Sequence, residues 1–187
     1  MRVHISEKNS KLGRIPNISL PPIETCVHFP PCATLCYARK AYEHYARNTV
    51  KPAWDENLAY YRSDSGSYFA DIMCWLEQHK PRYFRWHVGG DIPDEHYLMG
   101  MMVTALLNPQ VQFLAYSRRP WAWGRLPENL VVLRSYWLDE QPGAEAGFKV
   151  VPKGGSIADE VACLGKCQGC YACWHLQQGE YRVIHLH

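Results

Sequence analysis

The pattern of apolar and polar positions changes its period along the chain, from helical spacing in the first half to short apolar runs in the second. Five runs are rich in aromatic and β-branched residues and stop at glycine, proline or polar residues, which is typical of strands. The runs are RYFRWHV (82–88), VQFLAYS (111–117), NLVVLRSYW (129–137), GFKVVP (147–152) and RVIHLH (182–187). We expect the last of them at an edge of the sheet.

Helical spacing extends from Ala33 to about Lys80, with breaks predicted near Pro52 and at SDSGS (63–67). A further helix, YLMGMMVTALLN (97–108), lies between the first two strands, and Asp91 is expected to cap it. Strand, helix and strand joined by short loops predict an α/β fold with a parallel sheet. The sheet is either a small partial (β/α) barrel or open.

We expect a single domain over residues 1–187, because the terminal segments are too short to bury a core of their own. Its parts are a first cysteine segment (1–50), a parallel α/β core (82–152) and a tail cysteine segment (156–175). The stretch from Gly13 to Pro31 contains five prolines and is expected to be extended and irregular.

Composition narrows the class of protein. Apolar residues make up 47% of the chain and charged residues 20%, which is typical of a globular protein. The net charge of +2 gives no whole-molecule affinity for nucleic acid. The N-terminal sequence has no apolar signal region, and no run of about 18 apolar residues occurs, so we expect no membrane association and a cytoplasmic location. In that reducing compartment, the eight cysteines indicate metal or redox chemistry rather than disulfides.

Four cysteines, the tail group, lie within eleven residues near the end of the chain. Their spacing is close to a reversal of the ferredoxin run that binds a [4Fe–4S] cluster, and Gly165 and Gly169 permit the turns that such a loop requires. Zinc is the alternative, although structural zinc sites usually join two C-x2-C pairs farther apart. The tail group consists of Cys163, Cys167, Cys170 and Cys173.

Three more cysteines, the first group, are Cys26, Cys32 and Cys36. A fourth ligand could come from Cys74, from His28 or from a tail cysteine, or the fourth position could be open. Cys74 sits in a helical apolar pattern, where a lone cysteine usually packs as a small hydrophobe. We therefore expect a second [4Fe–4S] cluster with one open iron.

Arginines interleaved with aromatic residues follow two of the strands. Arg118, Arg119 and Trp121 come after the second strand, and Arg134 ends the third. Such residues can hold a phosphate or stack on a base, so they are candidates for contact with a nucleotide or nucleic acid. The alternative is a solvated loop with Trp121 packed on its rim.

The segment NSKLGRIPNISLPPIETC followed by PC-x3-CYA-x-KAY resembles the phage-encoded gene product 88 domain family, and the likeness extends to the C-x3-C-x2-C-x2-C-W tail. A more distant likeness is to the radical S-adenosylmethionine enzymes. Those enzymes have three early cysteines, a [4Fe–4S] cluster with an open iron, and a partial α/β barrel. For a phage protein the expected location is the host cytoplasm.

The second likeness implies a cofactor site after the first strand. Gly89, Gly90 and Asp91 look like the Gly-Gly-Glu segment that holds the amino group of S-adenosylmethionine, with Asp in place of Glu. The sequence departs from the common C-x3-C-x2-C spacing, because its gaps are five and three residues. The aromatic residue expected before the last cysteine instead follows it, as Tyr37.

The leading hypothesis is an iron–sulfur enzyme with an open-site cluster and an auxiliary cluster, supplied with electrons by a reductant protein. Its substrate class would be a nucleotide or a nucleic-acid base. The alternatives are a metal-stabilised nucleic-acid-binding module without enzyme activity, and an electron carrier.

Overall fold

The computed structural model describes residues 2–27, 30–120, 124–137, 140–141, 143, 145–151 and 161–185. Its centre is a seven-stranded sheet in which the strands follow one another in chain order. β1 is antiparallel to β2, and all later neighbours are parallel. The strands are β1 (Ile5–Ser6), β2 (Asn17–Ile18), β3 (Tyr83–Trp86), β4 (Gln112–Ser117), β5 (Leu130–Tyr136), β6 (Gly147–Val151) and β7 (Tyr181–His185).

The predicted α/β fold is confirmed, and the sheet is open, with β1 and β7 at its edges. All five predicted strands are present within one or two residues of their expected bounds, and the last of them, β7, is an edge strand. β1 and β2 give no signal in the sequence because each is two residues long. β2 lies within the proline-rich stretch that was expected to be irregular throughout.

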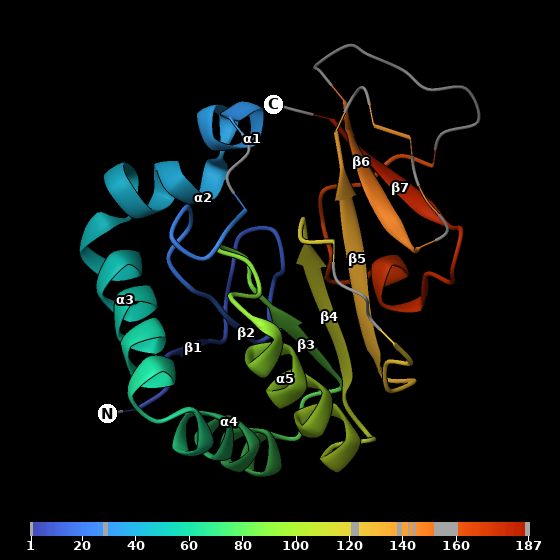
Figure 1. Cartoon of the computed structure of the whole chain (residues 1–187). Coiled ribbons are helices and arrows are strands. Elements are labelled where there is room, and N and C mark those ends of the chain that lie inside the picture. The colour runs from blue at the N-terminus through green and yellow to red at the C-terminus, as the bar shows by residue number, and fades with distance from the viewer. Residues whose placement is uncertain are drawn as a thin grey trace.

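The helices lie mostly on one side of the sheet (Figure 1). The helical elements are α1 (Pro30–Leu35), α2 (Tyr37–Lys40), the π-helix η1 (Ala41–Tyr45), α3 (Arg47–Ser63), α4 (Ser65–His79), α5 (Glu95–Leu107) and the 3-10 helix η2 (Ala172–His175). α3 and α4 connect β2 to β3, and α5 connects β3 to β4. Among the described residues, no helix connects β4 to β5 or β5 to β6.

Two predicted helix boundaries are wrong. α3 continues through Pro52, its sixth residue, although proline there removes one backbone hydrogen bond of the helix. α5 is capped by Asp94, whose carboxylate accepts a hydrogen bond from the Tyr97 amide at 2.8 Å, and Asp91 has another role. The break at SDSGS is confirmed, since Asp64 separates α3 from α4 and caps α4.

Alternation along the strands divides the core into two clusters. Phe84 and Trp86 of β3 and Phe113 of β4 face α3, α4 and α5 in the larger cluster. On the opposite face Leu114 of β4 and Leu133 of β5 belong to a second cluster.

No long helix covers this second face within the described residues. Leu12 and Ile15 of the N-terminal loop and Trp174 and Leu176 of the tail cover it instead. The two ends of the chain therefore complete the core.

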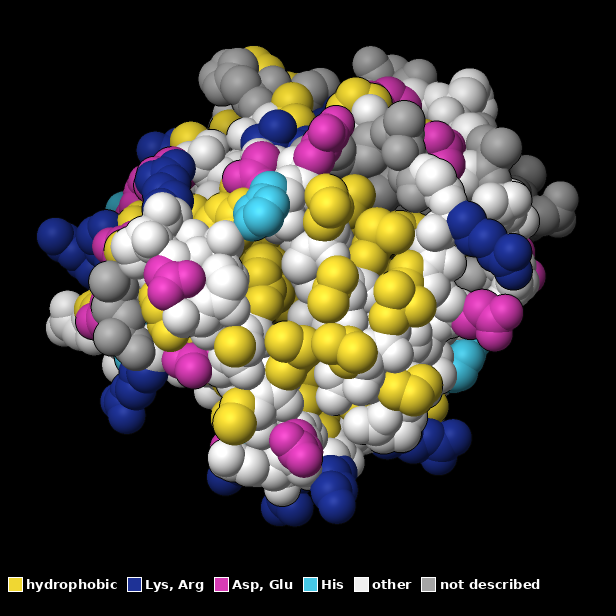
Figure 2. All heavy atoms as spheres, turned by 60° about the horizontal axis from the view of Figure 1, so that its bottom comes forward, with side chains coloured by type: hydrophobic (Ala, Val, Ile, Leu, Met, Phe, Trp, Pro, Cys, Tyr) yellow, Lys and Arg dark blue, Asp and Glu magenta, His cyan; other side chains and the backbone are white. Residues whose placement is uncertain are grey.

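The outer side of α5 is apolar. Met99, Val103, Leu106 and Leu107 are 48–65% exposed, and Figure 2 shows hydrophobic side chains gathered on the side of the molecule that includes this helix. Among the described residues, no helix is both long enough and apolar enough to cross a membrane.

Candidate metal centres

The four tail cysteines line one cavity of about 270 Å³. Their backbone is held at several points: the Cys163 amide donates to Val183 at 2.7 Å, and the Cys167 amide donates to Lys11 at 3.0 Å. Gly165 and Gly169 have φ of 73° and 93°, so they make the left-handed turns that the sequence led us to expect. The loop therefore brings its thiols to the same hollow.

Aromatic packing fastens this loop to the second face of the sheet. The Trp174 side chain is 2% exposed, and its indole N–H donates to the Phe84 carbonyl at 3.3 Å. The ring of Tyr171 stacks on Tyr83, with the centroids 4.3 Å apart. These contacts hold the tail cysteines against β3 although they lie about eighty residues later in the chain.

The N-terminal loop closes the other side of the tail. The Arg14 amide donates to the Gln168 side chain at 2.9 Å. A Cβ atom at Gly13 would lie 1.9 Å from the same Gln168 oxygen, so only glycine fits there. Residues near both ends of the chain thus form one structural unit around the tail cysteines.

The donor set of the tail cavity suits a soft metal or an iron–sulfur cluster. Burial raises the pKa of the Cys167 and Cys173 thiols, and neighbouring cysteines raise it further. Without a bound cation these thiols are neutral, and metal binding would release their protons. Among the described residues, no three His, Cys, Asp or Glu side chains are close enough to hold a metal ion, so binding requires the thiols to close around the cavity.

The first group lies elsewhere, at the carboxyl edge of the sheet. Cys32 is in α1, and Cys36 caps α2, where its sulfur accepts a hydrogen bond from the Arg39 amide at 3.4 Å. Burial raises the pKa of Cys26 to about 12, with further contributions from Asp91, Cys36 and Cys32. These three thiols and the Asp91 carboxylate are therefore neighbours.

The two glycines after β3 have a structural explanation. A Cβ atom at Gly89 would lie 2.3 Å from ring carbons of Trp54. Gly90 has φ of 79°, and a Cβ atom there would lie 2.7 Å from the Leu20 carbonyl oxygen and from the Thr25 hydroxyl. The close approach that these glycines permit is to the protein's own residues, in α3 for Gly89 and in the loop after β2 for Gly90.

Asp91 ties the ends of two strands together. It is 4% exposed, and its carboxylate accepts hydrogen bonds from the backbone amides of Ile92 at 2.7 Å and Arg118 at 3.0 Å. Burial raises its pKa, and these hydrogen bonds oppose the rise. The carboxylate is thus already used, which does not favour it as the ligand of a cofactor ammonium group. Its part in cofactor binding stays a prediction.

Tyr37 also has a structural contact, because its hydroxyl donates to the Val88 carbonyl and so holds α2 near the end of β3. This places the aromatic residue beside the Gly-Gly-Asp segment. Its contact with a cofactor is a prediction as well.

The candidate substrate arginines are engaged within the protein. Arg118 forms a two-pronged ion pair with Glu140, with N–O distances of 2.9 and 3.0 Å, and Arg119 donates to the Thr25 carbonyl at 3.1 Å. Arg134 lies close enough to Glu140 to lower the pKa of that carboxyl. Trp121 lies outside the described residues.

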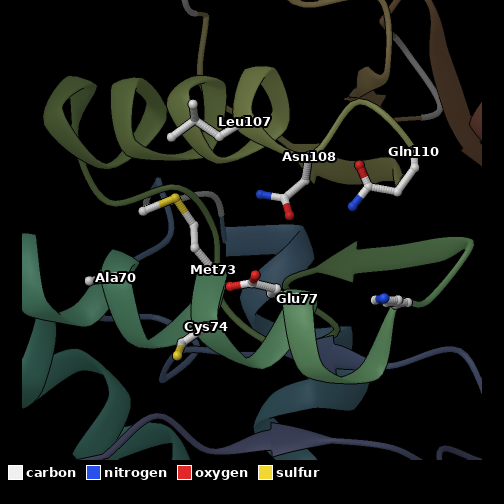
Figure 3. A pocket seen from close by; sticks show the side chains of 8 residues that line it. Ala70, Met73, Cys74, Glu77, Leu107, Asn108 and Gln110 are labelled. Carbon is white, nitrogen blue, oxygen red and sulfur yellow. The ribbon is translucent and has the colours of Figure 1, made fainter.

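Cys74 lies far from the first group. Together with Met73, Leu107 and Asn108 it lines a shallow hollow of about 770 Å³ between α4 and the end of α5 (Figure 3). Leu107 and Asn108 precede β4, so this hollow is near the amino edge of the sheet, whereas the first group is at the carboxyl edge. The larger hollow thus contains one thiol, and the smaller cavity contains four.

Sequence reasoning missed two residues beside the tail cysteines. Tyr116 lines their cavity, and Arg85 lies with its guanidinium carbon 3.5 Å from the centre of the Tyr116 ring. The available signal was a charged residue, Arg85, in the middle of the buried run RYFRWHV. A buried arginine requires a partner, and the sequence could not show which one.

Comparison with known proteins gives one match. A family model described as Gene product 88 matches residues 3–159, a span that includes Cys26, Cys32 and Cys36 and ends before Cys163. No curated protein and no solved structure matches the chain, and none of the comparisons supports the likeness to radical S-adenosylmethionine enzymes. Since the match covers most of the chain, the protein belongs to the Gene product 88 family.

Proposed function

We propose that this chain is an iron–sulfur protein with two centres, one closed and one open. The observation that carries the proposal is that four cysteines line one cavity on the second face of the sheet, whereas three others are neighbours at the carboxyl edge. Burial is the main cause that raises the pKa of these thiols, and Cys36 raises it further for Cys26 and Cys32, as Cys163 does for Cys167 and Cys173. The cysteines of each group are therefore near one another.

The tail centre has a complete set of four thiolate ligands. Four cysteines within eleven residues suit a [4Fe–4S] cluster better than a structural zinc site, because the cysteine pairs of zinc sites usually lie farther apart. Such a cluster supplies one-electron redox chemistry when bound. The protein holds the ligands, through the contacts of Cys163 with β7 and of Cys167 with the N-terminal loop.

The first centre has three thiolates, and its fourth position is open to a small molecule. Cys74, the remaining cysteine, belongs to the opposite edge of the sheet, and His28 lies outside the described residues. Ligands of parallel α/β folds bind beyond the carboxyl ends of the strands, which is where this group lies. This favours an enzyme over an electron carrier, because a carrier requires no open position.

The two centres would lie close to one another. Tyr116 borders the tail cavity. Arg118 lies near Cys32, where burial raises the thiol pKa and Arg118 partly opposes the rise. Tyr116 and Arg118 are two residues apart, and two residues along a strand span about 7 Å. Cys32, Cys167 and Cys173 also pack against the same hydrophobic cluster. The tail centre is thus suited to pass electrons from a reductant protein to the open centre.

S-adenosylmethionine is our candidate for the small molecule, with a nucleotide or nucleic-acid base as the substrate. Because Asp91 is already bound to two backbone amides, we expect the affinity for S-adenosylmethionine to depend more on the open iron than on this carboxylate. A nucleic-acid-binding module without enzyme activity is less favoured, since Arg118 and Arg119 make internal contacts.

The test is anaerobic purification followed by analysis of iron, sulfide and zinc, and by electron paramagnetic resonance of the reduced protein with and without S-adenosylmethionine. We expect about eight irons per chain, four for each cluster, and a spectral change on adding S-adenosylmethionine. Zinc without iron would contradict the proposal of clusters. Iron without any spectral change would contradict the S-adenosylmethionine proposal alone.

A further inference from the structure

Arg85 carries a positive charge into the interior of the protein. It is 4% exposed and lies on β3 between Phe84 and Trp86, so alternation places its side chain on the second face of the sheet, where the tail packs. Its guanidinium donates to the carbonyl oxygens of Trp86 at 2.9 Å and His87 at 3.3 Å, and it lies over the ring of Tyr116. These partners are neutral, so they solvate the charge without balancing it.

No carboxylate pairs with Arg85 in the described part of the chain, where the arginines that form ion pairs are Arg39, Arg62 and Arg118. A buried charge without a counter-charge is costly. The described residues that line the tail cavity include Lys166 and Arg182 and no acidic residue. The charged side chains in this described lining are therefore basic.

The cavity that Tyr116 lines also contains the four tail cysteines, whose thiols are acidic groups on the same face of the sheet as Arg85. As neutral thiols they give Arg85 no counter-charge. Four thiolates around a core of charge 2+, either Zn²⁺ or an oxidised [4Fe–4S] cluster, carry a net charge of 2− and would provide it.

Tyr116 connects the arginine to the ligands. Its ring contacts the Arg85 guanidinium, and its centre is 4.5 Å from that of Phe148. Tyr116 also lines the tail cavity together with Cys173. Its hydroxyl is therefore our candidate donor to the sulfur of a bound Cys173 thiolate.

We propose that Arg85 and Tyr116 tune the tail centre, Arg85 by balancing the charge of its thiolates and Tyr116 by donating a hydrogen bond to the Cys173 sulfur. This inference rests on the proposed tail centre. Hydrogen bonds to ligand sulfur and nearby charge are among the factors that set the potential of an iron–sulfur cluster. Both residues favour the reduced state, because reduction adds one negative charge to the centre.

The first experiment is a redox titration of the full-length protein by electron paramagnetic resonance, using the signal that Cys170→Ser removes. We expect Tyr116→Phe to reduce the ratio of reduced to oxidised centre about tenfold at a fixed potential, which is about 59 mV for one electron. Arg85→Met should reduce it further, and Arg85→Lys less. The control is Tyr83→Phe, an aromatic neighbour on the same face that stacks on Tyr171.

A second measurement uses the charge argument directly and does not require a redox-active metal. Arg85→Met should raise the melting temperature of the metal-free protein, because it removes an unbalanced charge, and should reduce the additional stabilisation given by the metal. In competition with a chelator, Arg85→Met and Tyr116→Phe should weaken retention of iron or zinc about ten- to a hundredfold.

The outcomes separate the two proposals. If the wild-type tail binds no metal, the tail centre and this inference both fail. If it binds metal and both variants behave like Tyr83→Phe in titration and chelator competition, only this inference fails. Should Arg85→Met not fold, Tyr116→Phe alone decides, since it removes one oxygen atom from a ring whose packing is unchanged.

Discussion

The two cysteine groups consist of the same side chains at similar local spacing, yet the protein holds them in different ways. The tail group is fixed by long-range contacts: Trp174 is buried under β3, and the N-terminal loop closes over Gln168. In the first group, Cys32 lies in the short helix α1 and Cys36 caps α2, while Cys26 lies in the loop before them. The tail segment therefore contributes to the core through Trp174, whereas two of the three first-group cysteines are placed by local helices.

This difference indicates different roles. A centre whose ligands lie beside core residues is held in a fixed geometry, which suits structural support or electron storage. A centre on short helices beyond the strand ends can leave one position for a ligand. The following changes, from the largest expected effect to the smallest, test the contrast.

Trp174→Ala should have the largest effect on stability. It removes a fully buried ring and a hydrogen bond to Phe84, so we expect a loss of about 3–5 kcal/mol in the free energy of unfolding. Denaturant unfolding measures this loss. Leu164→Ala, at a side chain that is 79% exposed in the same segment, is the control and should change stability by less than about 0.5 kcal/mol. Equal effects of the two changes would contradict a tail that belongs to the core.

Asp91→Ala should come next. Two backbone amides lose their acceptor in a buried place, so a loss of about 2–3 kcal/mol is expected in the same measurement. The control is Asp71→Ala, where the carboxylate accepts from the Tyr60 hydroxyl at a half-buried site and about 1 kcal/mol is expected. If Asp91→Ala left the free energy of unfolding unchanged and lowered the affinity for S-adenosylmethionine, the structural role would be contradicted, and Asp91 would have a binding role.

Gly89→Ala should cost about 1–2 kcal/mol, because the added methyl group meets the ring of Trp54. Gly66→Ala is the matched control. Its Cβ atom would contact only the Asp64 carboxylate at 3.5 Å, near the start of α4, so we expect a gain of about 0.4–1 kcal/mol. If Gly89→Ala were neutral, the tight packing of the carboxyl edge would be refuted.

Cys36→Ser should change the stability of the metal-free protein least, by less than about 0.5 kcal/mol. Serine keeps the capping hydrogen bond to the Arg39 amide and caps helices well. Cys173→Ser, which places a hydroxyl group in the second core cluster, should cost more. Thermal unfolding in the presence of a chelator compares the two, and the reverse order would contradict the distinction between the groups.

Much of the fold could be predicted from the sequence, because the five longer strands and α5 consist of apolar runs that leave a clear local pattern. β1 and β2 could not be, since two residues give no pattern. The sequence predicts Asp91 as the cap of α5, whereas the cap is Asp94. Both aspartates precede the helix, so the local sequence does not distinguish them. Long-range hydrogen bonds from Ile92 and Arg118 decide the role of Asp91.

In the candidate sites too, local features could be predicted from the sequence and long-range contacts could not. The spacing of the tail cysteines predicted their grouping, and the structure adds the cavity that they share. The pairing of Arg118 with Glu140 and the place of Arg85 behind the tail cysteines depend on contacts between distant strands and loops, and no local pattern encodes them. The sequence therefore predicts a substrate contact for Arg118 and Arg119, whereas the structure shows that they bind Glu140 and the Thr25 carbonyl.

The most direct test of two separate centres is metal analysis of Cys170→Ser and Cys36→Ser beside the wild type, with Cys74→Ser as the control, all purified without oxygen. We predict about eight irons for the wild type and for Cys74→Ser, and about four for each of the other two variants, with different remaining spectra. Loss of all iron in both Cys170→Ser and Cys36→Ser would instead mean one shared centre. It would contradict the separation of the tail group from the first group.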